Sequence, residues 1–380
     1  MRLISLLLMI SFLLAGCSSQ PQPEMTISSI PPATQSVSLS PAVPSSSDPM
    51  QNLLDAMTTE EKTGQLFLAR CPDAGAADDI TRFHLGGYLL FGQDFDNETP
   101  DSMEEKIALW QFSSPIPLLI AVDEEGGSVC RVSSHPAFRH SRFPSPRESY
   151  TRGGMESVLA AETEKASLLH SLGVNVAMGP VCDVTTRFDA FMYDRSLGES
   201  PEVTGRFAAN TLQIYQQHRL GSVLKHFPGY GNNDDTHVGL VLDDRTLEEL
   251  ENADLIPFAE GIRAGADAIL VSHTIVAAFD EELPASLSPA VHDYLRNTMG
   301  FSGVIITDDL VMEAISDIYG PEEAAVLAVL AGNDLLCSSE YHVQYPAVLE
   351  AVQDRRIPMA QLDASVMRIL QWKKDLGLIF

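Results

Sequence analysis

Short apolar runs alternate with longer amphipathic segments over most of this chain of 380 residues. Eight of the runs have the length of strands, and several are rich in Val, Ile and Leu, as strands buried on both faces are. These runs cover residues 65–69, 87–91, 117–122, 174–178, 222–224, 268–271, 304–306 and 334–336. Segments with a helical pattern lie between them, among them residues 155–171, 203–218, 246–263 and 322–330.

Eight strands, each followed by a helix, predict an α/β fold of the (β/α)8 TIM-barrel type. A doubly wound parallel sheet has the same alternation and is the alternative. Thr246, followed by Glu248 and Glu249, is a typical helix start. No further series of strands follows the last predicted helix, residues 359–376. We therefore expect one barrel domain over residues 50–380.

The first residues have the pattern of an export signal. The apolar run from Leu3 to Leu14 is too short to span a hydrocarbon core of about 30 Å and suits a signal peptide. It ends in Leu14-Ala15-Gly16-Cys17, which resembles the lipobox of bacterial lipoproteins. The resemblance implies a signal peptide over residues 1–16 and lipidation of Cys17. An ordinary signal peptide cut near Ala15 is the alternative.

Residues 18–49 contain ten Ser and seven Pro and few apolar side chains. Such a segment buries too little surface to offset its ordering entropy. We expect residues 17–49 to be a disordered tether. The protein would then be exported and anchored to the bacterial cell membrane by its lipid, on the extracytoplasmic side.

The composition excludes several functions. A formal net charge of −28 argues against nucleic-acid binding, because an acidic surface repels the phosphate backbone. The sequence has no P-loop, no G-x-G-x-x-G and no metal-binding spacing, so we expect neither cofactor nor metal. We also expect a monomer. The four remaining cysteines, which we expect to be mostly free, half-buried thiols, are Cys71, Cys130, Cys182 and Cys337.

Polar residues closely follow five of the predicted strands. In a barrel, the carboxyl ends of all strands open onto one mouth, where barrel enzymes carry their chemistry. Charged residues next to buried strands are costly unless they are paired or functional. We therefore expect these side chains to converge at the mouth; they are Asp123, Asp183, Lys225, His226, His273 and Asp308.

Three stretches are more specific than the strand pattern. They are residues 120–131 (IAVDEEGGSVCR), residues 224–231 (LKHFPGYG) followed by Asp235-Thr236-His237, and residues 303–312 (GVIITDDLVM). Shorter stretches between and after them are residues 179–183 (GPVCD), 195–198 (RSLG) and 331–334 (AGND). In this order they resemble glycoside hydrolase family 3, and within it the β-N-acetylglucosaminidase (β-N-acetylhexosaminidase) branch, over about residues 50–376.

The resemblance places Asp308 at the family's catalytic nucleophile. A retaining glycosidase needs a carboxylate that attacks the anomeric carbon and later leaves it. At the end of a buried strand such a carboxylate is held rigidly, and it stays ionised if backbone donors or cations meet it. Alternatively Asp308 and Asp309 cap the following helix, where Asp is favoured, and we expect this of one of the two.

The resemblance also implies that the proton donor is a histidine held by an aspartate, which His237 and Asp235 match. Imidazole titrates near neutral pH and can both give and take a proton. Residues 229–233 hold two glycines and two asparagines and are expected to be mobile. The chain departs from the family pattern in having Tyr230 between two glycines, where His is common. It also has Thr236 in place of Ser and an interval one residue shorter.

Further positions are implied to bind the terminal sugar. A carboxylate that accepts from neighbouring hydroxyls, with cations donating beside it, forms an effective clamp; a buried ion-pair network that only closes the barrel mouth is the alternative. The implied clamp residues are Asp123, Arg131, Arg195, Lys225 and His226. Met312 is expected to pack beside the sugar or to fill the core. We interpret Asp183 and His273 as supports of the clamp, and Glu124 and Glu125 as supports of a tight turn.

The sequence thus predicts a retaining glycoside hydrolase that removes terminal, non-reducing β-linked N-acetylglucosamine from cell-wall or chitin-type oligosaccharides. Alternatives within the family are a β-glucosidase or another β-glycosidase, and a β-glycoside phosphorylase. From another class, a non-catalytic sugar-binding surface lipoprotein is the alternative.

Overall fold

The computed structural model describes residues 48–380 apart from residues 186, 234, 237, 238 and 240. Eight parallel strands form one sheet in the order β11-β9-β7-β6-β3-β2-β1-β12. They are β1 (Phe67–Arg70), β2 (Gly87–Leu90), β3 (Leu119–Val122), β6 (Val176–Ala177), β7 (Gly221–Phe227), β9 (Ala268–Val271), β11 (Val304–Thr307) and β12 (Leu336–Ser338). A parallel bridge between Ile306 and Leu335 joins the two ends of the sheet. The sheet therefore closes into the predicted (β/α)8 barrel, and all eight predicted strands are present.

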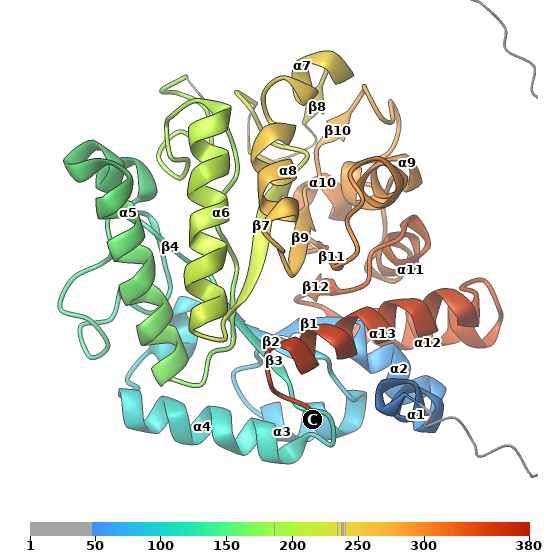
Figure 1. Cartoon of the computed structure of the whole chain (residues 1–380). Helices are drawn as coiled ribbons and strands as arrows, with labels where there is room; N and C mark the ends of the chain where they lie inside the picture. Colours follow the sequence, from blue (N-terminus) through green and yellow to red (C-terminus); the bar gives the residue numbers. More distant parts are fainter. Residues whose placement is uncertain (1–47, 186, 234, 237–238, 240) are drawn as a thin grey trace, which may run out of the picture. The chain divides into compact units, whose positions relative to one another are not determined.

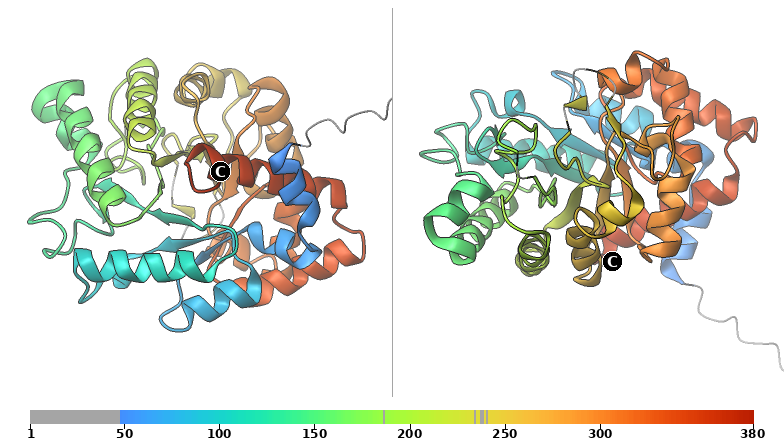
Figure 2. Two further views of the ribbon diagram at one scale, coloured as in Figure 1. Left: turned by 60° about the horizontal axis from the view of Figure 1, so that its bottom comes forward. Right: turned by 90° about the horizontal axis from the view of Figure 1, so that it is seen from above.

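Helices surround the barrel on its outside (Figures 1 and 2). They are α1 (Pro49–Ala56), α2 (Thr59–Gln65), α3 (Ala76–Phe83), α4 (Pro100–Ser113), α5 (Pro146–Ser171), α6 (Pro201–Gln217), α7 (Leu247–Glu251), α8 (Leu255–Arg263), α9 (Pro289–Asp293), α10 (Glu313–Ser316), α11 (Pro321–Ala331), α12 (Tyr341–Gln353) and α13 (Met359–Asp375). Short turns are η1 (Gly92–Phe95), η3 (Ala285–Leu287) and η4 (Tyr294–Thr298). Two small strand pairs lie outside the barrel, β4 (Glu124–Gly126) with β5 (Val129–Cys130), and β8 (Leu242–Asp243) with β10 (Ile275–Val276).

The helix predicted over residues 246–263 is two helices. Thr246 begins α7 as expected, because its side chain accepts from the Glu249 N–H and the Glu249 carboxylate accepts in return. The chain then breaks before α8, which has Pro257 in its first turn. Proline lacks an N–H and clashes with the preceding turn, so it fits the start of a helix but not its interior. The single-helix prediction was therefore wrong at this point.

Helix α5 begins nine residues before the predicted start at residue 155. Ser145 caps it, and Glu148 completes the capping box. Gly153 and Gly154 have non-helical backbone angles inside it, so α5 is kinked, and the predicted residues 155–171 form its second half. Glycine adopts such angles without the steric cost that a Cβ imposes.

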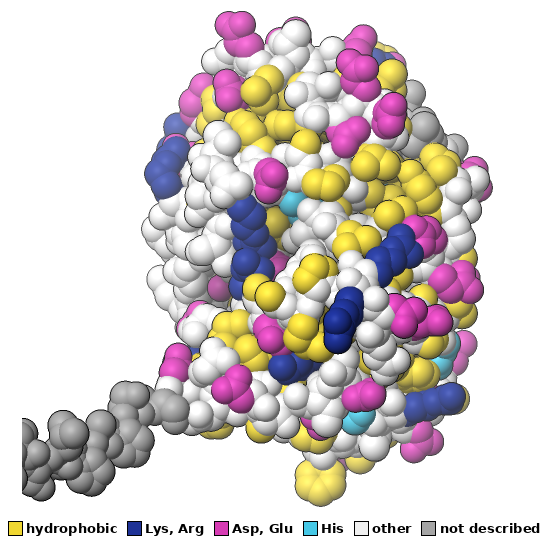
Figure 3. Space-filling model, turned by 90° about the vertical axis from the view of Figure 1, so that its right-hand side faces the viewer, with side chains coloured by type: hydrophobic (Ala, Val, Ile, Leu, Met, Phe, Trp, Pro, Cys, Tyr) yellow, Lys and Arg dark blue, Asp and Glu magenta, His cyan; other side chains and the backbone are white. Residues whose placement is uncertain are grey.

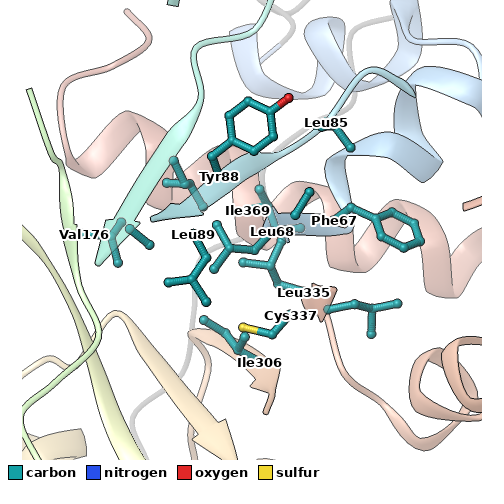
Figure 4. Packing of buried hydrophobic residues seen from close by; sticks show 14 of the residues in the cluster. Phe67, Leu68, Leu85, Tyr88, Leu89, Val176, Ile306, Leu335, Cys337 and Ile369 are labelled. Atoms are coloured by element: carbon teal, nitrogen blue, oxygen red, sulfur yellow. The ribbon is translucent and has the colours of Figure 1, made fainter. Parts of the chain in front are cut away.

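The main hydrophobic core fills the barrel and the layer between its strands and helices (Figure 4). Leu68, Leu89, Ile306 and Cys337 meet there from four strands that are far apart in sequence. The four described cysteines are free, as expected. They are, however, fully rather than half buried, and burial raises the pKa of each thiol. These thiols are therefore unreactive packing groups.

Acidic side chains are spread over the face of the molecule shown in Figure 3, with Lys and Arg between them. This distribution agrees with 52 acidic against 24 basic residues in the chain. Among residues 48–380, as far as they are described, no helix has both the length and the apolar character needed to cross a membrane.

Candidate active site

A cavity of about 590 Å³ opens at the carboxyl ends of the barrel strands. Every predicted catalytic or sugar-binding residue that the structure describes lines it. These residues are Asp123, Arg131, Arg195, Lys225, His226, Asp235, Asp308 and Met312. His237, the predicted proton donor, and Cys17, the predicted lipidation site, lie outside the described residues. The structure thus brings together side chains that are up to 189 residues apart in sequence, between Asp123 and Met312.

Four side chains of alternating charge are linked at the cavity: Asp123, Lys225 and Arg195 line it, and the buried Glu125 lies behind them. The Lys225 ammonium, on β7, lies 2.5 Å from Oδ1 of Asp123 and 2.6 Å from Oε1 of Glu125. Arg195 donates to both oxygens of the same Glu125 carboxylate, with Nε at 2.9 Å and Nη2 at 2.7 Å. Glu125 lies three residues beyond the end of β3, and its carboxylate pairs with both cations at once.

Burial and charge act against each other in this network. Burial alone would raise the pKa of Glu125, but Arg195 and Lys225 lower it well below its usual value. Burial alone would lower the pKa of Lys225, but Asp123 and Glu125 raise it. Each group therefore keeps its charge because its partners are present. The two cations hold Glu125 ionised, and its carboxylate is their shared counter-ion rather than the support of a tight turn that the sequence predicted.

Asp183 holds the imidazole of His226 from behind. Its Oδ2 lies 2.8 Å from Nδ1 of His226 and also accepts the His226 main-chain N–H. The other imidazole nitrogen, Nε2, lies 3.1 Å from Nη2 of Arg195. Oδ1 of Asp183 accepts from the main-chain N–H of Tyr230 at 2.8 Å. The fully buried Asp183 thus fixes the His226 ring without itself lining the cavity.

The two aspartates after β11 are held differently. Asp309 accepts from Ser339, whose hydroxyl lies 2.5 Å from Oδ2, and from the N–H groups of Ser339 and Val311. This carboxylate supports the turn after β11 and does not cap the next helix, because α10 begins at Glu313 without a side-chain cap. Asp308 also lines the cavity, and its Oδ1 accepts the Asp309 N–H at 2.9 Å.

His273 supports this turn from below. Its Nε2 lies 3.0 Å from the main-chain oxygen of Asp309, and its Nδ1 lies 2.7 Å from the Ser286 hydroxyl. Glu124 likewise supports the loop after β3, since its carboxylate accepts from the N–H of Val132 at 2.7 Å and from Ser133. Neither His273 nor Glu124 lines the cavity.

The loop that carries Arg195 is fixed by Arg147 of α5. The Arg147 guanidinium lies on the Tyr193 ring at 3.8 Å and donates to the Tyr193 main-chain oxygen and to the Ser196 hydroxyl. Gly198 makes room for it, because a Cβ at this position would lie 2.4 Å from the guanidinium carbon. This packing explains physically why the stretch RSLG has Ser and Gly at these positions.

Several cavity residues were not predicted, although they also follow barrel strands. Arg70 is the last residue of β1, Phe91 follows β2 and Ser339 follows β12. Two guanidiniums lie near the Phe91 ring, with the Arg70 carbon at 4.5 Å and the Arg131 carbon at 5.5 Å from its centroid. The strand-end rule, applied to all eight strands instead of five, would have found Arg70 and Ser339, but not the apolar Phe91, which was counted as part of the strand run 87–91.

A strand-tip carboxylate beside a network of paired charges, at the carboxyl ends of the strands of a barrel, is typical of the active site of a barrel enzyme. Among the described residues, no group of three or more His, Cys, Asp or Glu side chains is placed to hold a metal ion. The chain belongs to glycosyl hydrolase family 3, because the model of the family's N-terminal domain matches residues 58–372. It is therefore a glycoside hydrolase by family.

Curated relatives match between about three quarters and nearly all of the chain. The chain is 31% identical to Beta-hexosaminidase LpqI of Mycobacterium tuberculosis over 387 aligned positions, which cover 98% of this chain and 97% of that protein. It is 35% identical to a Beta-hexosaminidase of Xylella fastidiosa, over 76% of this chain and 86% of the other. Among solved structures, a family 3 β-N-acetylglucosaminidase from Paenibacillus sp. superposes with a TM-score of 0.79 at 32% identity, over 85% of this chain and 63% of the other.

Proposed function

We propose that the protein is a retaining β-N-acetylglucosaminidase that removes terminal, non-reducing β-linked N-acetylglucosamine from oligosaccharides. The observation that carries the proposal is the position of Asp308, at the tip of β11 and in the same cavity as Asp123, Lys225 and His226. The names of the relatives, β-hexosaminidase and β-N-acetylglucosaminidase, support the substrate class.

The clamp is suited to a neutral sugar. Two carboxylates, Asp123 and Glu125, balance two cations, Lys225 and Arg195. Because these charges balance, the sugar needs no charge of its own. On binding, its hydroxyls exchange hydrogen bonds with water for charge-assisted hydrogen bonds to side chains that the ion pairs already orient. The partly exposed Asp123 carboxylate and the Arg131 guanidinium are available to its hydroxyls, and Met312 packs beside the ring.

In the first step, the Asp308 carboxylate attacks the anomeric carbon, and the bond from this carbon to the leaving oxygen breaks. The leaving oxygen keeps the electron pair and takes the proton of the His237 imidazolium. In the second step, His237 takes a proton from water as the water oxygen attacks the same carbon, and the ester to Asp308 breaks. Asp235 stabilises the imidazolium and sets its tautomer.

Turnover of p-nitrophenyl β-N-acetylglucosaminide, glucoside and xyloside tests the substrate class, and we expect the N-acetylglucosaminide to be strongly preferred. Asp308→Ala should abolish release of nitrophenol while far-UV circular dichroism stays unchanged. His237→Ala with a dinitrophenyl substrate should accumulate a glycosyl ester on the peptide that carries Asp308, which mass spectrometry detects. An unlabelled Asp308 peptide during turnover would contradict the nucleophile assignment.

We further propose that the protein is exported and anchored through Cys17, with residues 17–49 as a disordered tether between the lipid and the catalytic barrel, which acts as a monomer. Leu14-Ala15-Gly16-Cys17 and the Ser- and Pro-rich composition of residues 18–49 support this proposal. Fractionation of cells tests it. The wild type should be found with membranes, Cys17→Ser should not, and both should be equally active.

A further inference from the structure

Tyr230 and Thr236 are two positions at which this chain departs from the family pattern around Asp235 and His237, and their side chains contact each other. The Tyr230 phenol oxygen lies 2.5 Å from Oγ1 of Thr236. Tyr230 is 1% exposed and Thr236 is 0% exposed, so water cannot replace either partner. Because a buried hydroxyl without a partner is costly, this contact keeps Thr236 beside Tyr230.

The Tyr230 end of the contact is anchored to the sugar clamp. Its main-chain N–H donates to Oδ1 of Asp183, the carboxylate whose Oδ2 holds His226. Its ring packs edge-on against the His226 ring, with centroids 5.3 Å apart, and edge-on against Phe191 of the cavity wall at 5.5 Å. Tyr230 is therefore fixed relative to the part of the cavity that would hold the sugar.

At the other end of the contact, Thr236 is the residue between the two members of the proposed acid–base pair. Thr236 directly follows Asp235, which lines the cavity, and directly precedes His237. Tyr230 itself does not line the cavity. Its influence on the reaction must therefore pass through the residues that it contacts.

We propose that Tyr230 is a positioning residue, whose hydroxyl contact with Thr236 holds Asp235, the carboxylate of the proposed acid–base pair, in register with the sugar clamp. The inference rests on the proposed function. Burial and the nearby Asp308 charge raise the pKa of Tyr230 well above its usual value, so the phenol stays protonated and the contact persists over the working pH range.

Tyr230→Phe tests the proposal, because it removes the hydroxyl and keeps the ring. A series of aryl β-N-acetylglucosaminides, from dinitrophenyl to phenyl, together with chitobiose, reports how much the reaction depends on proton donation. We expect kcat to fall about five- to tenfold for chitobiose and the phenyl glycoside, the size expected for one buried hydrogen bond. The loss should be within about twofold for the dinitrophenyl glycoside, and KM should change little because the clamp is intact.

Three further variants separate positioning from a general loss of structure. Thr236→Val should have the same leaving-group profile as Tyr230→Phe. The double variant should be no slower than the slower single one, because both remove the same contact. Thr236→Ser, which keeps the hydroxyl, should restore the wild-type profile. Tyr88→Phe is the matched control, since the buried Tyr88 hydroxyl donates to the main-chain oxygen of Ala76 at 2.8 Å, away from the cavity.

An equal loss with all leaving groups, additive losses in the double variant, or the same profile in Tyr88→Phe would overturn the inference. These results differ from a failure of the proposed function. In that case the wild-type protein itself would release no phenol from any N-acetylglucosaminide.

Discussion

Glu125→Gln is the substitution whose effect follows most directly from the geometry of the site. The Glu125 side chain is 1% exposed and is the shared partner of Lys225 and Arg195, at 2.6 and 2.7 Å. The amide of Gln removes the negative charge and turns an N–H group towards one of two buried cations. Breaking a buried ion pair from one side costs about 3–5 kcal/mol, a large part of the 5–15 kcal/mol that typically stabilises a folded protein. We expect the variant to fold but to melt roughly 4–7 °C below the wild type, since the entropy of unfolding of a domain of this size is about 0.7 kcal/mol per kelvin.

Urea unfolding at pH 7, followed by fluorescence of the two tryptophans, measures the effect. Glu323→Gln is the matched control, because Glu323 also receives two hydrogen bonds from one guanidinium, that of Arg356, but both side chains are about half exposed. It should cost at most about 1 kcal/mol. The pKa of Glu125 is lowered in the folded protein, so its contribution is complete above the usual value of 4.5 and declines as the pH falls below it. The reasoning would be refuted if the two variants lost the same unfolding free energy. It would also be refuted if the loss in Glu125→Gln were as large in acid as at pH 7.

Two further outcomes are expected. His237→Ala should slow hydrolysis severely for poor leaving groups and much less for dinitrophenol, which needs little protonation; a rate loss independent of leaving-group pKa, measured over the aryl series, would show that another group is the acid. Lys373 is fully buried, has Gln65 as its hydrogen-bond partner at 2.7 Å, and its pKa is lowered by burial from 10.5 to about 7. Because the unfolded chain then binds more protons than the folded protein, the unfolding free energy should rise between about pH 7 and 10.5. Lys373→Met should flatten this rise and stabilise the protein at pH 7 by about 2 kcal/mol. Removing the buried amine gains at most about 5 kcal/mol, the equivalent of the pKa shift, and the Gln65 oxygen left without a partner costs about 1–3 kcal/mol of this gain. A steep pH dependence retained in Lys373→Met would assign it to other groups.

The fold was predictable because it depends on patterns that are local in sequence. Runs such as the one at residues 304–306 are too apolar for an exposed element and too short for a helix, and their alternation with amphipathic segments leaves few topologies. The break between α7 and α8 was also predictable in principle, from Pro257. Strand ends were less certain, since β7 continues through Lys225 and His226 to Phe227, where polar side chains conceal the strand pattern.

The site was predictable to the extent that strand tips must meet at the barrel mouth. The contacts that organise it were not. Glu125 is a shared counter-ion only because Arg195, 70 residues further along the chain, reaches it across the mouth. Likewise, nothing in the order of residues indicates that Tyr230 and Thr236 touch, because their contact depends on the path of the loop and on burial. The strand pattern and the family resemblance identify which side chains lie at the barrel mouth. Packing of the folded chain decides which of them contact one another.

The seam at which the barrel closes has a consequence for catalysis. Only a few main-chain hydrogen bonds join β11 to the start of β12, and the fully buried Asp334 reinforces them by accepting from the Ile305 N–H and by pairing with Arg296 and Arg368. Ile305 and Asp308 lie three residues apart, on and just beyond the same strand. The Asp334 carboxylate, just before β12, thus helps to hold β11, the strand that ends at the proposed nucleophile, in place. We expect the loss of the Asp334 carboxylate to lower turnover first, while the protein remains folded.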